Sequence, residues 1–127
     1  MKHYKTKTFS GESKLEVVSD KVLLETIDDF INLDTLGQNR CSLGAGLYKL
    51  RLASKKDAGK SGGSRSILAF KKDTVVYWIH LFPKSFKDNV TTKELNNLKK
   101  LSKILLNLGD KDIAKLLKNG EILEVLK

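Results

Sequence analysis

Apolar and polar residues alternate along Leu47–Ala53, which is the period-two pattern of a strand with one buried face. One face carries apolar or aromatic side chains and the other is cationic: Tyr48, Leu50 and Leu52 against Lys49 and Arg51. The Gly-, Ser- and Lys-rich segment 54–63 predicts a loop. An extended pattern resumes over residues 64–70, so the two strands are expected to pair as a hairpin.

Two more segments predict strands. The apolar run over residues 74–82 is β-branched and aromatic and ends at Pro83, which is typical of the most buried strand of a sheet. Residues 4–9 alternate loosely and are rich in Thr and aromatic residues, so we expect a first strand that ends near Ser10-Gly11.

Apolar residues at helical spacing predict the helices. Ser19 is a suitable N-cap for a helix over residues 20–33. Thr91 and Glu94 form a capping-box pattern before a leucine stripe that reaches Gly109. Asp110 is expected to cap a short helix that stops at Asn119-Gly120. Residues 34–46 lack periodicity and predict a loop, and residues 121–127 are expected to form a tail.

The predicted order of elements is strand, helix, three strands and then helices. This order favours a compact α+β fold, in which an antiparallel β-sheet packs against helices. The 127 residues are about one average domain, so residues 1–127 are expected to fold as a single domain.

Composition adds a strong charge to this picture. Hydrophobic residues make up 40% and charged residues 31%, which is typical of a folded soluble protein. The 24 basic and 15 acidic residues leave a net charge of +9, which attracts polyanions such as nucleic acid or an acidic protein. A basic protein that is merely soluble is the alternative.

The sequence offers few other reactive groups. Cys41 is the only cysteine, and with no base expected nearby we interpret it as structural. Neither Cys/His spacing nor a carboxylate pair predicts a metal site, so no metal or small-molecule cofactor is expected. The N-terminus has no apolar stretch long enough for a signal peptide or membrane span, so the protein is expected in the cytoplasm, without a membrane partner.

A cationic cluster is the first candidate for chemistry. The segment GKSGG lacks the first glycine of a phosphate-binding P-loop, because Ser54 stands at that position, and a strand follows it. If the hairpin forms, its basic residues converge on one sheet face beside the basic loop: Lys49, Arg51 and Arg65 with Lys55, Lys56 and Lys60. Fixed cations can stabilise the charge that builds on phosphorus when RNA is cleaved through its own 2′-hydroxyl. The alternative is a solvated charged face.

His80, Phe82 and Lys84 form a second candidate, because they share parity along the third strand. Aromatic rings stack on unpaired bases, and a histidine can move a proton near neutral pH. A core position is the stronger interpretation of Phe82, and both interpretations of His80 stay open. His3 is expected to have no catalytic role.

Several blocks together resemble the HigB-like branch of the RelE/ParE toxins of type II toxin–antitoxin systems, and they span nearly the whole chain. The central blocks are Gly46–Ala53, Gly59–Arg65, Phe82-Pro83-Lys84, Lys87-Asp88-Asn89 and Glu94-Leu95; the outer ones are Tyr4–Lys7, Phe9 and Gly120–Val125.

The resemblance implies the RelE fold, ribosome-dependent cleavage of messenger RNA, and neutralisation by an antitoxin that is acidic or carries a helix-turn-helix domain. It implies that Arg65 binds the scissile phosphate and that Lys49, Arg51 and Lys60 bind backbone phosphates. Lys84 is implied as a second phosphate ligand or proton-transfer group.

This chain departs from the family pattern at several positions. Leu50 stands where the family commonly has a second basic residue, and Ser64 where it has an aromatic one. His80-Leu81-Phe82-Pro83-Lys84 replaces Tyr-Gly-Phe-Ala-Lys, and a histidine in place of the tyrosine preserves a proton-transfer group. Two other functions remain open: a ParE-like inhibitor of DNA gyrase, because one fold can host both activities, and a non-catalytic RNA-binding module.

Overall fold

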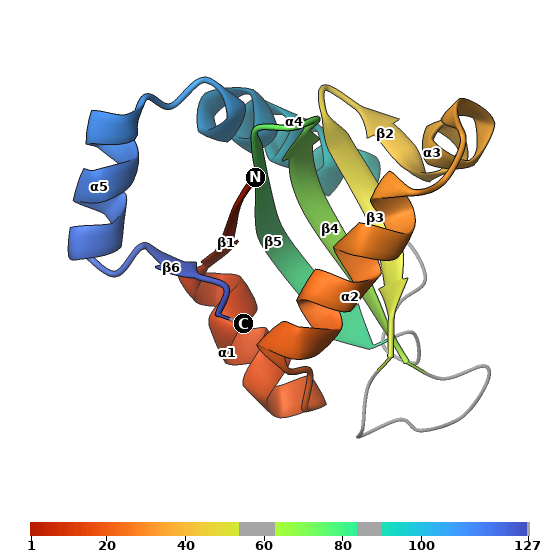
Figure 1. The fold of residues 1–127 in the computed structure, drawn as a ribbon, viewed down its shortest axis with the longest axis horizontal. Helices are drawn as coiled ribbons and strands as arrows, with labels where there is room; N and C mark the ends of the chain where they lie inside the picture. Colours follow the sequence, from red (N-terminus) through yellow and green to blue (C-terminus); the bar gives the residue numbers. More distant parts are fainter. Residues whose placement is uncertain (54–62, 84–89, 127) are drawn as a thin grey trace.

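The computed structural model describes residues 1–53, 63–83 and 90–126, which form an open β-sheet with helices on both faces (Figure 1). The strands are β1 (Lys2–Thr6), β2 (Ser42–Gly44), β3 (Leu47–Leu52), β4 (Ser64–Lys71), β5 (Val75–Pro83) and β6 (Ile122–Glu124). The helices are α1 (Lys7–Glu16), α2 (Asp20–Ile31), α3 (Thr35–Cys41), α4 (Thr92–Leu106) and α5 (Asp110–Lys118).

The strand order is β2-β3-β4-β5-β1-β6, and the α+β class is confirmed. The predicted hairpin is also confirmed, because β3 and β4 pair antiparallel from Leu47↔Ala69 to Leu52↔Ser64. The neighbouring pairs are antiparallel except β1 with β5, which run parallel from Lys2↔Val75. The sheet is therefore mixed where the sequence predicted an antiparallel one.

Local capping produces the two predicted long helices. The Ser19 hydroxyl accepts from Val22 N at 3.3 Å at the start of α2. At the start of α4, Thr91 and Glu94 exchange the two hydrogen bonds of a capping box, at 3.1 and 3.2 Å. These bonds satisfy backbone N–H groups that the helix itself leaves unpaired. The helices therefore begin directly after the capping residues Ser19 and Thr91.

The prediction at the N-terminus was wrong in its second half. The strand ends at Thr6, and residues 7–16 form α1 instead of the rest of a strand. Thr6 Oγ1 accepts from Phe9 N at 3.0 Å and so caps the helix. Phe9 is fully buried, and its ring lies 5.8 Å from that of Trp78. Tertiary packing thus holds a helix whose own apolar periodicity is weak.

Residues 34–46 are not a loop throughout, because α3 and β2 lie there. Asp34 Oδ1 accepts from Gly37 N at 2.7 Å and caps α3. The helix has only 7 residues, which is too short for a periodic signal. Cys41 is its last residue and packs half-buried against the core, with its thiol 3.5 Å from the Gly37 carbonyl oxygen. A structural role for Cys41 fits this environment.

Two expectations at the C-terminal end were also wrong. Gly109, not Asp110, is the N-cap of α5 and makes no side-chain cap bond. Asp110 lies in the first turn and pairs with Lys2 Nζ at 3.0 Å. The expected tail contains β6, which pairs antiparallel with β1 through Thr6↔Ile122. Strand β6 is only 3 residues long, which is too short to give a clear sequence pattern. It is stabilised by its pairing with β1.

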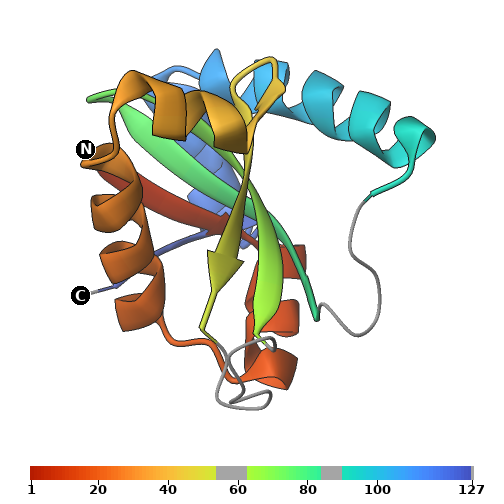
Figure 2. The same ribbon diagram turned by 90° about the vertical axis from the view of Figure 1, so that its right-hand side faces the viewer.

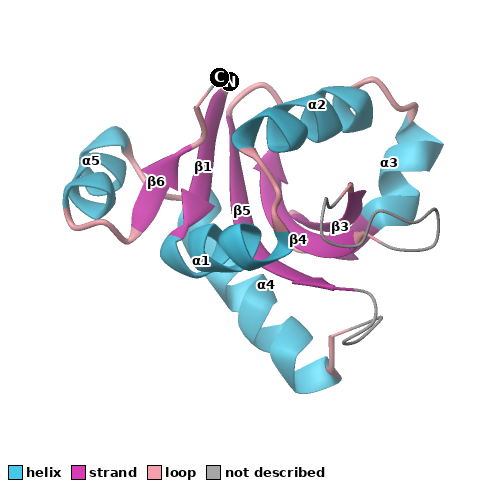
Figure 3. Cartoon of the chain, turned by 90° about the horizontal axis from the view of Figure 1, so that it is seen from below, coloured by secondary structure: helices cyan, strands magenta, loops and turns pink. Residues whose placement is uncertain are grey.

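The core lies on both faces of the sheet, since α2 and α4 cover opposite faces (Figure 3). On the α2 face, Leu50, Leu52 and Trp78 pack with residues of α1 and α2. On the α4 face, Leu47, Ile67 and Tyr77 pack against the leucines of α4. The strands twist between these two layers (Figure 2), as strands of L-residues do. The α4 face also carries the basic residues of the hairpin.

A β-bulge in β5 changes which side chains reach the α4 face. Ile67 of β4 pairs with His80, but the next residue, Leu68, pairs with Trp78, so Ile79 is the extra residue. Before the bulge Tyr77 faces α4, and after it Phe82 does. The inserted residue shifts the alternation by one position, so His80 lies on the same face as Tyr77.

Tyr77 carries a buried hydroxyl without a hydrogen-bond partner among the described residues. We expect Tyr77→Phe to leave the free energy of unfolding unchanged or to raise it by about 1 kcal/mol, because an unsatisfied polar group is removed. Burial raises the pKa of Tyr77 to about 12 from 10.0. Between those pH values the Tyr77 hydroxyl ionises in the unfolded chain but not in the folded one. The free energy of unfolding of the wild type therefore falls as the pH rises, and that of Tyr77→Phe falls less. Urea unfolding at pH 9 to 12 measures this; equal losses in both proteins would contradict it.

Candidate functional site

The basic residues of the hairpin meet on the α4 face of the sheet. Arg51 of β3 lies directly across from Arg65 of β4, and Arg65 lies directly across from Phe82 of β5. One row up, Lys49 pairs with Ile67 and Ile67 with His80. Paired residues share a face, so these side chains line one side of three adjacent strands. His80 is the diagonal neighbour of Arg65 in this register, and diagonal neighbours in a sheet are typically about 7–8 Å apart.

Arg65 has an unusual environment for a guanidinium group. The residue is half-buried, and its Nη1 atom is buried without a hydrogen-bond partner among the described residues. Arg51, which is exposed, brings a second positive charge directly opposite. A buried unpaired donor costs about 1–3 kcal/mol, and like charges across a ladder repel. The arrangement destabilises the free protein, and an anion between the two groups would relieve the cost.

Helix α1 supplies a partner for His80. Glu12 Oε1 and Oε2 lie 2.9 and 2.8 Å from His80 Nδ1, and both side chains are about one quarter exposed, at 22% and 28%. Glu12 Oε1 also accepts from the backbone N–H of Leu81 at 3.1 Å. A carboxylate only accepts, so Nδ1 carries the proton and Nε2 is left as the basic nitrogen of the neutral ring.

The same contacts close the edge of β5. Strand β1 ends at Thr6, and α1 then lies alongside the second half of β5 (Figure 3). Thr6 Oγ1 donates to the Ile79 carbonyl at 2.9 Å, one residue before His80. Side chains of Thr6 and Glu12 thus bind backbone groups that a longer β1 would pair. These two hydrogen bonds fix the backbone on either side of His80, at the Ile79 carbonyl and at the Leu81 N–H.

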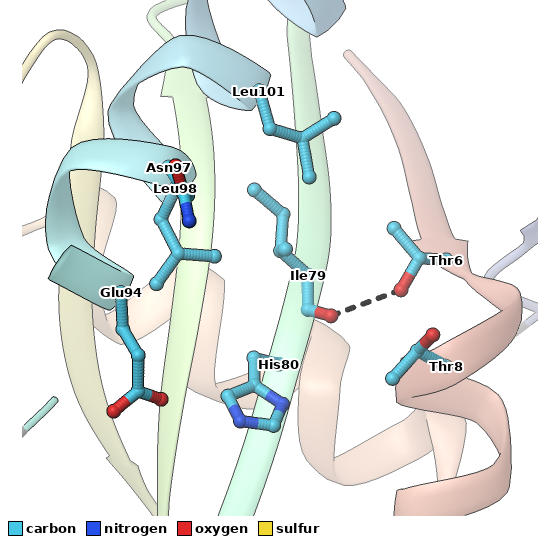
Figure 4. Close-up of a pocket in the computed structure, with 8 residues that line it drawn as sticks. All are labelled: Thr6, Thr8, Ile79, His80, Glu94, Asn97, Leu98 and Leu101. Carbon is cyan, nitrogen blue, oxygen red and sulfur yellow. Dashed lines mark hydrogen bonds between the residues drawn. The ribbon is translucent and has the colours of Figure 1, made fainter.

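A cavity of about 350 Å³ opens beside His80, between α1, β5 and α4 (Figure 4). Its apolar side is made by Ile79, Leu98 and Leu101, and its polar lining comes from several elements: Thr6, Thr8, His80, Glu94 and Asn97. A second cavity of about 260 Å³ is lined by Glu12, Leu15, Glu16, His80, Leu81, Phe82 and Pro83. His80 lines both cavities, so it lies between two hollows that could each take part of a chain-like ligand.

Comparison with known proteins adds the identity. A family model described as the RelE toxin of the RelE/RelB toxin–antitoxin system matches residues 1–125. The chain belongs to the RelE toxin family. RelE-family toxins are generally endoribonucleases, and the family implies an antitoxin partner of the RelB kind. No curated protein matches the chain. In the part of this RelE toxin that the structure describes, no helix is long and apolar enough to cross a membrane.

The departures of this RelE toxin from the family pattern have structural reasons. Leu50 is 8% exposed and packs in the core on the α2 face, where a basic residue would be buried. Ser64 is fully buried and donates to Glu16 Oε1 at 3.2 Å, which ties the start of β4 to α1. Phe82 is 3% exposed and lies in the α4-side core, 5.4 Å from the His80 ring, as the core interpretation expected.

The structure brings together some of the predicted site residues and leaves others aside. It places Lys49, Arg51, Arg65, His80 and Phe82 on one face. Four predicted site residues lie outside the described residues: Lys55, Lys56, Lys60 and Lys84. Sequence reasoning missed Glu12, the hydrogen-bond partner of His80. Glu12 follows a segment predicted as a strand, so no helical pattern pointed its side chain at His80.

Proposed function

We propose that this RelE toxin is an endoribonuclease that cleaves messenger RNA on the ribosome without a metal ion, through Arg65 and His80. One observation carries the proposal: the Arg51–Arg65 pair lies on the same sheet face as a histidine that a carboxylate orients. Cationic groups stabilise the charge that develops on the phosphate, and an oriented general base activates the attacking RNA 2′-hydroxyl, so both promote transphosphorylation.

In the proposed reaction His80 acts as the general base. Its Nε2 removes the proton of the 2′-hydroxyl, whose oxygen attacks the adjacent phosphorus. The bond to the 5′-oxygen breaks, which leaves a 2′,3′-cyclic phosphate and, once the leaving oxygen takes up a proton, a 5′-hydroxyl. Glu12 stabilises the imidazolium that forms, because its carboxylate accepts the Nδ1 proton. We assign Lys84, a residue outside the described part, to the leaving group or a second phosphate oxygen.

Arg65 is proposed to bind the scissile phosphate. Its buried Nη1 needs an acceptor, and charge-assisted bonds to phosphate oxygens supply one. Extra negative charge develops on these oxygens as phosphorus becomes pentacoordinate, so the interaction strengthens in the transition state. Arg51 and Lys49 are proposed to bind neighbouring phosphates, together with three lysines outside the described residues, Lys55, Lys56 and Lys60. Phe82 is proposed to support the site from the core.

The proposed partners are messenger RNA in the ribosome and an antitoxin that is acidic or carries a helix-turn-helix domain. The net charge of +9 supports both, because each partner would bring negative charge to the basic face. The proposed location is the cytoplasm, where translating ribosomes are found.

Induced expression in a bacterial host, followed by mapping of RNA 5′ ends, tests the function. We expect growth arrest, fragments that begin with a 5′-hydroxyl, and an intact copy of any reporter message whose start codon is removed. Arrest with intact transcripts and inhibition of purified gyrase would support the topoisomerase alternative. Salt-dependent RNA binding with neither effect would support the non-catalytic one.

Glu12→Gln tests the orienting role of the carboxylate. The amide can still accept from Leu81 N, but it does not neutralise an imidazolium. We expect the cleavage rate on programmed ribosomes to fall about tenfold, with KM little changed. Glu25→Gln, on the exposed side of α2, is the matched control. An unchanged cleavage rate would remove Glu12 from the mechanism.

A further inference from the structure

We propose that an acidic, amphipathic helix of the antitoxin docks along α4 and inserts an apolar side chain into the cavity between α1, β5 and α4. The α4 docking face is defined by four apolar residues, Ile79 of β5 and Leu98, Leu101 and Ile104 of α4. The docking itself is independent of the proposed function, and only its effect on cleavage rests on that function.

Helix α4 leaves part of its apolar face uncovered. Leu105 is buried against the sheet, whereas Leu98 and Leu101 are half-buried and line the cavity of about 350 Å³ together with Ile79 (Figure 4). Ile104 lies one turn after Leu101 and is 61% exposed. Apolar side chains at this spacing form the kind of stripe that a partner helix covers in helix-in-groove recognition.

Positive charge flanks the α4 docking face. Lys93 and Lys100 lie one turn before and one turn after Asn97, which lines the cavity, and Lys7 lies across the cavity at the start of α1. All three lysines are exposed, and none pairs with a carboxylate among the described residues. Glu94 brings the single carboxylate of the described lining and accepts from Thr91 N in the capping box. A partner with acidic residues beside its apolar stripe therefore complements this face.

Two other occupants fit this face less well. Single-stranded RNA binds by stacking its bases on aromatic rings, and the described lining offers only the His80 ring beside aliphatic side chains. A second copy of this chain, docked through the same face about a twofold axis, would bring the lysines of both copies together. The antitoxin that the RelE family implies is the partner that can supply both an apolar stripe and negative charge.

Docking at this face also reaches the proposed general base. His80 lines the same cavity as Leu98 and Leu101. An apolar side chain of the partner, inserted there, would exclude RNA from the imidazole without contacting Arg51 or Arg65. Antitoxin binding and RNA cleavage are therefore expected to be mutually exclusive.

Peptide binding is the first arm of the test and needs no cleavage. The probe is a synthetic helical peptide of about 18 residues that carries leucine along one stripe and glutamate on both flanks. An isomer with the same residues in scrambled order keeps the charge but loses the stripe. By fluorescence anisotropy we expect the amphipathic peptide to bind about tenfold more tightly than the isomer, and its affinity to fall as salt is added. Equal affinity for the two peptides would overturn the proposal.

Ile104→Ser tests the face itself, because it removes an exposed apolar side chain and leaves the charge unchanged. We expect the affinity for the amphipathic peptide to fall about tenfold. Leu36→Ser is the matched control, since Leu36 is 62% exposed on α3, and its affinity is expected to stay within about twofold of wild type. Unchanged affinity in Ile104→Ser would overturn the proposal. An equal loss of affinity for single-stranded RNA, or a dimer in sedimentation that Ile104→Ser abolishes, would overturn it in favour of those occupants.

Cleavage on programmed ribosomes is the second arm. The amphipathic peptide is expected to inhibit wild-type toxin at the concentrations at which it binds. Ile104→Ser is expected to cleave at the wild-type rate but to require about tenfold more peptide for the same inhibition. Peptide binding without inhibition would overturn the competition with RNA. A toxin that cuts no RNA at all would count against the proposed function alone, and the binding measurements would still decide the docking.

Discussion

Arg65→Ala is expected to lower the rate of ribosome-dependent RNA cleavage by about two to three orders of magnitude, the usual loss when a fixed donor to a developing charge is removed. The same change is expected to leave the free energy of unfolding unchanged or higher, because it removes a buried unpaired Nη1 and the repulsion from Arg51. Lower activity with equal or higher stability distinguishes a functional side chain from a structural one. Single-turnover cleavage of message on programmed ribosomes and urea unfolding measure the two effects.

Two controls sharpen this result. Arg65→Lys keeps the charge but not the planar pair of donors, so it is expected to recover only part of the rate. Arg40→Ala removes an exposed arginine from the last turn of α3 and is expected to cleave at the wild-type rate. If Arg65→Ala cleaves as fast as wild type, or unfolds several kcal/mol more easily, Arg65 does not bind the scissile phosphate and its placement is structural.

His80→Ala is expected to lower the cleavage rate by about two to four orders of magnitude, which is the second large effect. The cause is loss of the base that Glu12 orients, and the carboxylate is left facing the Leu81 N–H alone. The residue borders two cavities, so free imidazole has room to occupy the vacated position. Added imidazole is therefore expected to restore part of the rate, with a pH dependence that follows its own titration.

His3→Ala is the matched control, because His3 lies on β1, outside both cavities that His80 lines. We expect its cleavage rate to stay within about threefold of wild type. A His80→Ala protein with full activity would assign proton transfer to another group. Lost activity without any imidazole rescue, in a protein with wild-type unfolding behaviour, would argue for a binding role of the ring in place of base catalysis.

The elements that sequence predicted well are those in which local chemistry agrees with the tertiary environment. Ser19 and Thr91 cap helices with strong apolar stripes, and the β3–β4 hairpin has clear alternation and a polar connection. Helix α1 was missed because Ser10 and Gly11 are poor helix formers, and burial of Phe9 outweighs that propensity. Strand β6 was missed because it forms through pairing with the distant strand β1, and its own 3 residues are too few for a strand pattern.

For the site, the sequence alone determined the positive charge and the placement of the basic residues of the hairpin on one face of the sheet. Period-two alternation put Lys49, Arg51 and Arg65 on one face, because regular strands fix side-chain direction every second residue. Regular alternation predicts nothing about where β5 gains an extra residue. The bulge at Ile79, which the sequence pattern does not mark, turned His80 to the arginine face.

Only the tertiary structure paired His80 with Glu12, which lies 68 residues away in sequence and comes from a helix that local patterns did not predict. The physical reason is that strand periodicity is a local property of the backbone, whereas the bulge and its carboxylate partner depend on how α1 packs along the edge of β5.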